Sequence, residues 1–501
     1  MKTKQLTSRQ RQFLELVSQA VFANPFSEDR RRADLAIAGS APSDREEHGL
    51  PKALERIRAS LKELDEQGKS DLGKHSGQDR MLLETAHLFD IFHLFVARFD
   101  KLIRDQIEAP ADLLPVPFAG EALRLLAGRG FNDRDAVRYF ATFYQLRRAF
   151  HFIHCDLIGR SDSMKELRRS LWNNVFTADM RLYERALWNR MDDFSTLLMG
   201  ETGTGKGAAA AAIGRSGFIP FDEKKRCFAA SFMSTFIAVN LSQFSESLIE
   251  SELFGHRKGA FTGAVDSHDG VFARCSPYGS IFLDEIGDVS VPVQIKLLNV
   301  LQNRVFSPVG SHETRQFRGR VITASNRPID ELRSKGAFRD DFFYRMCSDV
   351  IVVPPLRRRI AEDPRDLDDL LTVTLRRIIG GGHAREEGVI EHMAAAVREA
   401  IFSSVGPDYA WPGNVRELEQ AVRRILITGG YDGDLRPSAD GPETALVAGI
   451  REGQISAKEM LTGYCRLLYE RYDTYEEVAR RTELDRRTVK KYIEMQEKRK
   501  A

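Results

Sequence analysis

A glycine-rich segment has the residue types and spacing of a phosphate-binding loop. It lies between an apolar run, 194–199, and an alanine-rich stretch, 208–213, which predicts a strand, a loop and a helix. In such a loop the backbone N–H groups and the helix N-terminus attract phosphate, and Lys206 reaches the β- and γ-phosphates of a nucleotide. A glycine-rich turn with a chance lysine is the alternative, which the flanking elements disfavour. The predicted nucleotide-binding residues are Gly200, Glu201, Thr202, Gly203, Thr204, Gly205, Lys206 and Gly207.

Acidic and amide side chains follow two later apolar strands. Asp284 and Glu285 end the run 279–285, and Asn326 ends the run 321–326. The carboxyl ends of parallel strands face the ligand in open α/β sheets, as the phosphate loop does. We therefore expect Asp284 to hold magnesium through water, and Glu285 to orient and polarise an attacking water. Asn326 would touch the γ-phosphate or that water, although a helix-capping role is a plausible alternative.

Magnesium needs this help because Gly207 stands where a serine or threonine hydroxyl often assists the metal. Three arginines farther along could also act on phosphates. Arg339 and Arg345 lie six residues apart among aromatic residues, and we interpret them as fingers that reach a neighbouring subunit's γ-phosphate. Salt-bridged surface arginines are a fair alternative. Arg416 follows a Pro-Gly turn and could return to the phosphates of its own subunit, or merely pair with Glu417 or Glu419.

The stretch 250–264 has no explanation in nucleotide chemistry. It combines small residues with one aromatic residue and a threonine, and its glycines would let a loop tip move. A buried phenylalanine in a tight turn is the alternative, but glycines on both sides fit a projecting loop better. Within this stretch is the hexapeptide Gly259, Ala260, Phe261, Thr262, Gly263 and Ala264.

This hexapeptide resembles the signature loop of bacterial enhancer-binding proteins, the AAA+ activators of RNA polymerase carrying sigma-54. The resemblance covers about residues 156–427 and includes the motifs above in family order. It implies that the hexapeptide, through Phe261 and Thr262, contacts sigma-54. It also implies that ATP and Mg²⁺ bind between the subunits of a ring, commonly a hexamer.

The resemblance assigns further roles to single residues. Asp284 and Glu285 match the Walker B pair, and Asn326 matches sensor I. Arg339 and Arg345 match the trans-acting fingers, and Arg416 matches sensor II. Asn240, which ends the run 236–240, matches the asparagine that restrains the catalytic glutamate. The chain departs from the family at Gly207, where glutamate is usual, and in the stretch 217–234, which has the character of an insertion.

The tail predicts a helix-turn-helix, with one helix at 475–482 and a second at 486–498. Glu483 takes the turn position where glycine is common. The segment 486–500 has seven basic and two acidic residues, and a solvated basic helix end is the alternative to a DNA-binding role. The predicted DNA-binding residues are Arg486, Arg487, Thr488, Lys490 and Lys491.

The N-terminal part predicts helices with aromatic residues on one side, chiefly at 81–107 and 131–153. We favour the core of a helical bundle over an aromatic ligand pocket, and a phosphoacceptor receiver domain is not indicated. The cue that this part senses is not evident from the sequence.

Composition narrows the class of protein. The net charge of +2 predicts no attraction of the whole chain to nucleic acid, so any DNA contact must come from a local patch. No signal peptide or membrane span is visible, and the scattered cysteines suit a reducing cytoplasm. Those cysteines are Cys155, Cys227, Cys275, Cys347 and Cys465.

The predicted fold class is multidomain α/β. We expect an all-helical regulatory domain at 1–155, an AAA+ P-loop α/β subdomain at 156–355, in which the last apolar strand is 350–353, and a helical lid at 356–427. A linker at 428–454 and a helix-turn-helix domain at 455–501 follow.

The expected function is sigma-54-dependent activation, in which ATP hydrolysis remodels the closed polymerase–promoter complex and the tail binds upstream double-stranded DNA. Two alternatives remain. One is a regulator that acts by occupying DNA, with the ATPase core as a scaffold. The other is an AAA+ remodeller of a different target.

Overall fold

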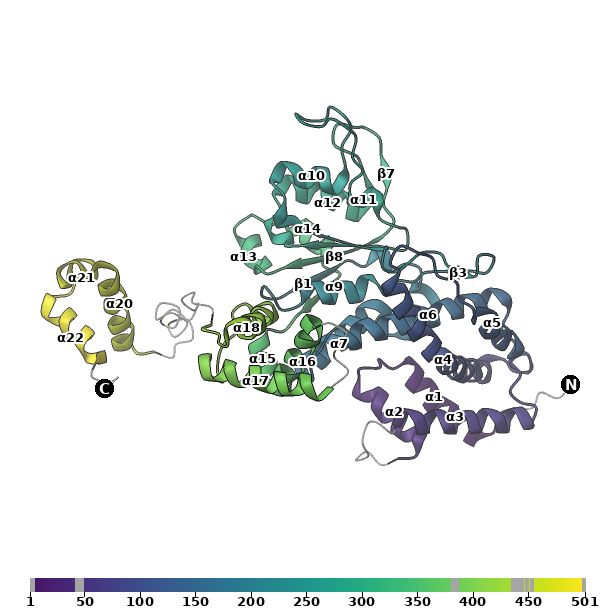
Figure 1. Ribbon diagram of the computed structural model, residues 1–501. Helices are drawn as coiled ribbons and strands as arrows, with labels where there is room; N and C mark the ends of the chain where they lie inside the picture. Colours follow the sequence, from purple (N-terminus) through teal and green to yellow (C-terminus); the bar gives the residue numbers. More distant parts are fainter. Residues whose placement is uncertain are drawn as a thin grey trace. The chain divides into compact units, whose positions relative to one another are not determined.

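The structure is a computed structural model that describes residues 5–40, 49–379, 387–433, 446, 450 and 455–497. The chain divides into two compact units, Met1–Gly429 and Gly430–Ala501 (Figure 1). The predicted linker, 428–454, lies mostly outside the described residues. Among the described helices, none is both long enough and apolar enough to span a membrane.

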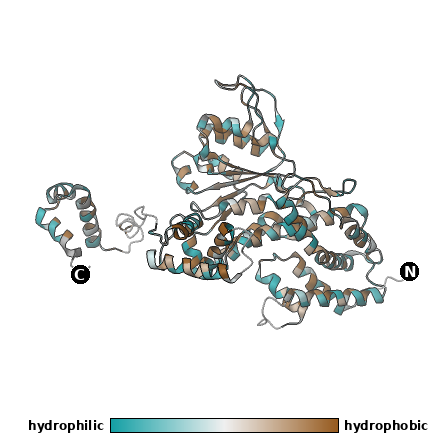
Figure 2. Ribbon diagram, in the orientation of Figure 1, coloured by the Kyte–Doolittle hydropathy of each residue, from teal (hydrophilic) through white to brown (hydrophobic). Residues whose placement is uncertain are grey.

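Every described α-helix before residue 156 belongs to a helical part of the first unit, and Figure 2 shows hydrophobic and hydrophilic residues along the same helices. Two of these helices, α2 and α5, were not predicted, because each is too short for its helical periodicity to be clear. The elements are α1 (Ser8–Phe22), α2 (Glu28–Ala38), α3 (Gly49–Glu66), η2 (Leu72–Lys74), α4 (Gly77–Glu108), α5 (Ala119–Gly128) and α6 (Asp133–Cys155).

A five-stranded parallel sheet forms the centre of the unit, in the order β4-β5-β8-β1-β9. The predicted strands are confirmed to within about two residues, since buried parallel strands are nearly continuous apolar runs. They are β1 (Thr196–Met199), β4 (Phe236–Asn240), β5 (Ser280–Asp284), β8 (Arg320–Ser325) and β9 (Asp349–Val352).

Helices cover both faces of this sheet. Leu198 and Phe282 belong to the hydrophobic cluster that also contains α9 and the N-terminal helices, whereas Leu197 and Ile281 belong to the cluster of α12 and α14. Alternation along each strand therefore separates the two layers. The first layer contains α7 (Asp162–Phe176) and α9 (Lys206–Gly214); the second contains α10 (Glu246–Phe254), α11 (Val271–Arg274), α12 (Val291–Asn303), α13 (Ile329–Ser334) and α14 (Asp340–Met346).

Short elements connect these parts. They are α8 (Met180–Leu182), the π-helical turn η3 (Tyr183–Leu187), η4 (Met191–Asp193), η5 (Leu241–Gln243), η6 (Ile286–Asp288) and the two-residue strands β6 (Val305–Phe306) and β7 (Arg315–Gln316).

The stretch 217–234, predicted to be an insertion, is the surface on which the N-terminal helices dock. It contains the antiparallel strands β2 (Phe221–Asp222) and β3 (Cys227–Phe228). The ring of Phe228 stacks on Tyr144 of α6 with centroids 4.0 Å apart, and Phe221 meets Phe140 at 5.0 Å. The aromatic residues of α6 thus join the N-terminal helices to the α/β part in one continuous core.

Arg148 of α6 adds hydrogen bonds to the apolar contacts of this junction. Its side chain is fully buried, and its guanidinium donates to the carbonyl oxygens of Arg215 at 2.6 Å and Gly217 at 2.7 Å. These carbonyls follow α9, where the helix dipole places partial negative charge. Burial lowers the pKa of Arg148 to about 10. Arg148 therefore caps the C-terminus of the helix that begins at Lys206.

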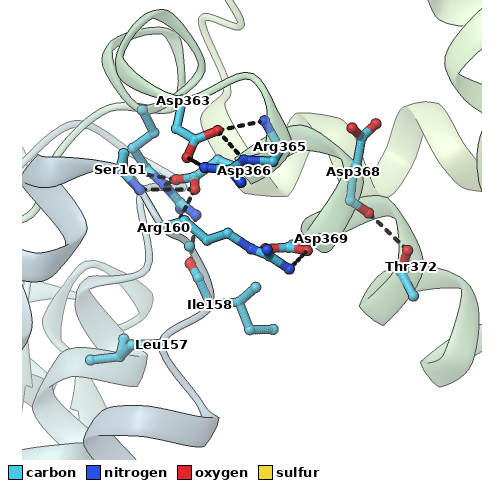
Figure 3. Close-up of polar contacts among 12 residues, drawn as sticks. Leu157, Ile158, Arg160, Ser161, Asp363, Arg365, Asp366, Asp368, Asp369 and Thr372 are labelled. Carbon is cyan, nitrogen blue, oxygen red and sulfur yellow. Dashed lines mark hydrogen bonds and ion pairs between the residues drawn. The ribbon is translucent and has the colours of Figure 1, made fainter. Parts of the chain in front are cut away.

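The predicted lid consists of α15 (Leu356–Glu362), α16 (Arg365–Ile379), α17 (Glu387–Val405) and α18 (Asn414–Thr428). A buried carboxylate ties it to the segment that leads into α7 (Figure 3). Asp366 accepts hydrogen bonds from the backbone N–H groups of Arg160 and Ser161, and forms a 3.0 Å ion pair with Arg359. Arg359 also donates to the carbonyl oxygen of Ile158.

The second unit has the three described helices α20 (Ala457–Tyr472), α21 (Tyr475–Thr482) and α22 (Arg486–Glu497). Cys465, Val478 and Val489 form its buried centre, one from each helix. Glu483 lies in the left-handed region with φ 55°, the conformation that makes glycine common at this turn. Asp485 accepts from the backbone N–H groups of Arg487 and Thr488 and so caps α22. The predicted residues 498–500 lie outside the described residues.

We expect Asp366→Ala to lower the free energy of unfolding by about 3 kcal/mol, because it leaves the buried Arg359 guanidinium without its carboxylate. The control is Asp369→Ala, which removes the more exposed ion pair with Arg160 and should cost less than about 1 kcal/mol. Urea unfolding of the full chain measures both. Equal losses would contradict the role given to Asp366.

Candidate nucleotide-binding site

The predicted phosphate loop joins β1 to α9. Gly203 has φ 80° and Gly205 has φ 103°, values that glycine adopts without strain. Lys206 is the first residue of α9, and its ammonium donates to the carbonyl oxygens of Gly200 at 2.9 Å and Glu201 at 3.0 Å. The Lys206 side chain therefore lies against the predicted phosphate loop.

The acidic pair lies at the carboxyl end of β5, as predicted. Glu285 is in the left-handed region with φ 58° and ψ 45°, which is uncommon for a residue with a side chain. Its backbone N–H donates to the Asp284 carboxylate at 3.0 Å, and its own carboxylate accepts from the backbone N–H of Asn326 at 3.3 Å. This backbone conformation gave no signal in the sequence, and strained residues of this kind gather at functional sites.

Charges at this edge of the sheet influence one another. Burial raises the pKa of Glu285, and the neighbouring Asp284 adds to the rise, whereas Lys206 opposes it. Burial lowers the pKa of Lys206, and Arg416 adds to this lowering, whereas Glu285 and Asp284 oppose it. Both pKa values therefore move in the direction that disfavours the charged form, which is typical of a partly desolvated site.

The two asparagines occupy neighbouring parts of the same edge. The Asn326 amide donates to the Thr202 hydroxyl at 3.0 Å and so links β8 to the phosphate loop. Asn240 is opposite Asp284 in the β4–β5 register, but its side-chain oxygen accepts from the backbone N–H and hydroxyl of Ser242. No hydrogen bond between Asn240 and Glu285 is present in the described residues, and the restraining role stays a prediction.

A buried amide joins the lid to the phosphate loop. Asn414, with φ 54° and no exposed surface, donates to the Glu201 carboxylate and to the Thr202 carbonyl oxygen, both at 3.1 Å. Its oxygen accepts from the backbone N–H of Leu356 at 2.8 Å. Glu201 also receives two hydrogen bonds from Arg357, which are the main cause of the lowered pKa of this carboxyl.

Sequence reasoning did not assign roles to Asn414 and Arg357. For Asn414 a signal existed, since asparagine tolerates the left-handed region and follows a Pro-Gly turn here. For Arg357 no signal existed, because its contact with Glu201 joins parts of the chain that are 156 residues apart.

The backbone of Arg416 lies near the phosphate loop, because the backbone N–H of the preceding Val415 donates to the Gly203 carbonyl oxygen at 3.0 Å. The two acids proposed as its alternative partners have other contacts. Glu417 accepts from the Tyr409 hydroxyl and the Gly413 backbone, and Glu419 pairs with Arg377 and Arg423. The exposed Arg416 side chain therefore stays a candidate for a phosphate contact.

Arg339 and Arg345 do not join the site of their own chain. Arg339 forms a 2.7 Å ion pair with Asp341, and Arg345 donates twice to the carbonyl oxygen of Leu301, at 3.0 and 2.8 Å. Arg345 is exposed on α14, whereas Arg339, which precedes the helix, is half-buried. Action on a neighbouring subunit remains a prediction.

The loop that contains the hexapeptide extends beyond α10 and α11, beside a second loop that precedes β7 (Figure 1). The two loops are joined by the Arg257 backbone N–H, which donates to the Val309 carbonyl oxygen at 3.0 Å. Phe261 is 37% exposed and lies 4.9 Å from the His256 ring. Gly259 and Gly263 have φ 80° and 101°, and the Gly259 N–H donates to the Ala264 carbonyl oxygen at 2.8 Å. The hexapeptide is therefore a closed, exposed turn rather than a buried one.

Comparison with known proteins decides the family. A family model described as the Sigma-54 interaction domain matches residues 176–352. The C4-dicarboxylate transport transcriptional regulatory protein DctD of Pseudomonas aeruginosa is 32% identical over 354 residues, which are 69% of this chain and 67% of that protein. The chain belongs to the family of sigma-54-dependent transcriptional activators.

Other members of the family match a shorter part of the chain. The Sigma54-dependent transcriptional activator SfnR of Pseudomonas putida is 37% identical over 47% of this chain and 57% of that protein. Transcriptional regulatory protein ZraR of Klebsiella oxytoca is 37% identical over 49% of this chain and 52% of that protein. The chain therefore spans about half the length of these two relatives.

Gly203→Ala should weaken nucleotide binding by about tenfold, because a Cβ at φ 80° would overlap the Gly413 carbonyl oxygen and move α18 from the loop. The control is Gly207→Ala, where a Cβ meets no atom within 4 Å. Titration with a fluorescent ATP analogue measures both affinities. Unchanged binding in Gly203→Ala would show that the lid contact does not position the loop.

Proposed function

We propose that the protein hydrolyses ATP with Mg²⁺ and uses the energy to remodel the closed promoter complex of sigma-54 RNA polymerase. The observation that carries this proposal is the convergence of Lys206, Glu285 and Asn326 at one edge of the sheet, in a chain with an exposed Phe261 loop. A scaffold for passive DNA binding would need no water-orienting carboxylate beside a phosphate loop.

The residues fit a nucleotide and its metal. The Lys206 ammonium has two carbonyl oxygens as partners, which phosphate oxygens could replace. Asp284 would hold Mg²⁺ through water, since Gly207 offers no hydroxyl. Bound Mg²⁺ neutralises charge that develops on the phosphates. Glu285 would orient and polarise the attacking water, and Asn326 would fix the γ-phosphate end of the site.

The arginines of α14 support a site shared between subunits. Arg345 is exposed and Arg339 is half-buried, and both make their described contacts away from the phosphate loop of their own chain. We propose that they reach the γ-phosphate of a neighbouring subunit in a homo-oligomeric ring, which by resemblance to the family would have six subunits. Arg416 would act on the phosphates of its own subunit.

The tail would bind upstream double-stranded DNA through α22. The support is the compact α20–α22 core, the left-handed turn at Glu483 and a helix start that carries arginines. Arg487 and Lys491 are exposed, whereas Arg486 forms an ion pair with Glu476 and Thr488 donates to the Asp485 cap. Of the predicted DNA-binding residues, Arg487 and Lys491 are thus the better candidates for phosphate or base contacts.

Glu285→Gln should reduce ATP hydrolysis at least about a hundredfold and leave ATP affinity nearly unchanged, because an amide cannot polarise water. The control is Asp288→Asn, which changes an exposed acid paired with Arg327.

Since the pKa of Glu285 is raised, the rate of ATP hydrolysis by the wild type should fall on acidification, and should do so at a higher pH than if this glutamate were exposed. Steady-state phosphate release tests this, and hydrolysis near the wild-type rate in Glu285→Gln would refute the assignment.

Phe261→Ala should abolish transcription activation and sigma-54 binding while ATP hydrolysis persists, because the loop lies apart from the phosphate site. Tyr278→Ala is the matched control, since Tyr278 is 38% exposed but precedes β5 at the end opposite Asp284. In vitro transcription from a sigma-54 promoter and pull-down of sigma-54 measure the outcome. Full activation by Phe261→Ala would favour a regulator that acts by occupying DNA.

A further inference from the structure

A cavity of about 730 Å³ lies among the N-terminal helices and the segment that leads into the α/β part. Its walls come mainly from α1, α4 and α6, with further residues from α2, α3, α7 and the α8–η3 segment. Cavities of this size hold small organic ligands in other proteins. Seven of its lining residues are phenylalanine, tyrosine or tryptophan: Phe22, Phe89, Phe92, Tyr139, Phe143, Phe150 and Trp172.

The aromatic side of α4 therefore contributes both to the bundle core and to the cavity wall. The sequence favoured the bundle core alone. Phe95 and Phe99 are almost fully buried in the bundle core, as predicted. Leu88, Phe92 and Val96 are half-buried and line the cavity, and Leu88 and Phe92 also pack against the core. The half-buried residues thus pack on the predicted bundle core and also border a cavity. Helical periodicity alone does not reveal such a cavity.

The acidic groups of the cavity wall already have donors from the protein. Glu184 accepts from the Tyr139 hydroxyl at 2.6 Å, Glu84 from Arg80 at 2.9 Å, and Glu15 from Gln78 at 3.1 Å. A cationic ligand would have to compete with these contacts.

Two of the basic groups differ from the acidic ones in this respect. Arg30 and Arg147 pair with Asp34 and Asp100, but Arg181 and Arg185 form no ion pair within the described residues. The described side-chain contacts of Arg181 are the Ser18 hydroxyl at 3.4 Å and the Phe22 ring, and that of Arg185 is the Met81 sulfur at 3.7 Å. Both guanidiniums are exposed, which places uncompensated positive charge at an aromatic cavity.

We propose that this cavity binds a hydrophobic organic anion, with an aromatic or alicyclic body among the phenylalanines and an acidic group at Arg181 and Arg185. The apolar walls remove the body from water, at about 25 cal/mol for each Å² of apolar surface buried. Planar guanidiniums bind carboxylate or sulfonate oxygens through paired N–H donors. A neutral hydrocarbon would leave these donors unused.

The position of the cavity gives its occupant a route to the nucleotide site. Trp172 belongs to α7, which packs against α9, β9 and α15. The α6 wall also carries Arg148, the cap of α9. An anion in the cavity would therefore change ATP turnover, a consequence that rests on the proposed ATPase function, whereas the binding itself does not.

The test uses two fluorescent probes that share their rings and differ in one acidic group. They are 8-anilino-1-naphthalenesulfonate and neutral N-phenyl-1-naphthylamine, titrated into the full chain without nucleotide. The double variant Leu88→Trp with Val96→Trp narrows the cavity and should weaken both probes by about tenfold. Its control is Leu94→Trp with Ile107→Trp, two exposed positions of the same helix that do not line the cavity.

The charge is tested separately by Arg181→Gln with Arg185→Gln. This variant should weaken the sulfonate by about tenfold and leave the neutral probe nearly unchanged. Its control is Arg98→Gln with Arg104→Gln, exposed arginines of α4 outside the cavity. These variants change only exposed side chains, so they keep the test decisive if the tryptophan variants fail to fold.

The proposal is overturned if neither probe saturates, or if the cavity and control variants bind alike. Equal weakening of both probes by the Arg181 and Arg185 changes would overturn the anionic part. ATP hydrolysis is then compared with and without the sulfonate. A bound probe that leaves hydrolysis unchanged would remove the regulatory consequence and keep the binding site.

Discussion

The parallel pairing of β1, β5 and β8 determines where the groups of the candidate site lie. In this register Met199 is opposite Ser325, and Leu283 is opposite Thr323, so three strands end at the same edge. The phosphate loop, the acidic pair and Asn326 each follow one of these ends. A slip of one residue in a strand would turn its side chains to the opposite face of the sheet. Residues that now pack in one hydrophobic core would then face the other.

Electrostatics at this edge follow from the limited access of water. Burial is the largest cause of the shifted pKa values of Lys206 and Glu285, and the charge of each opposes the shift of the other. The left-handed backbone at Glu285 and the N–H of Asn326 fix the carboxylate that is proposed to act on water. The backbone therefore positions part of the site without a bound nucleotide.

The N-terminal helices are continuous with the α/β part rather than tethered to it. The hairpin within 217–234 packs its aromatic residues on α6, and Arg148 caps α9 from the same helix. The ion pair of Asp366 and Arg359 ties the lid to the segment before α7. Since α9 begins at Lys206, a change in the N-terminal helices has a short packed route to the phosphate loop.

Local sequence was enough to predict the elements whose signal lies in neighbouring residues. The apolar runs gave the five strands of the sheet, glycine spacing gave the phosphate loop, and the pattern at 475–482 gave α21. The hexapeptide at 259–264 pointed to the family that the comparisons establish. Each of these depends on side-chain type and short-range periodicity, which are visible in a single sequence.

Tertiary structure decided what depends on distant segments meeting. The contact of Asn414 with Glu201, the docking of 217–234 on α6 and the cavity beside Arg181 each join residues far apart in the chain. Periodicity shows that a residue such as Phe92 faces inward, but not whether another side chain or open space lies opposite. That depends on how completely the helices fill the volume between them, which is a property of the packed fold.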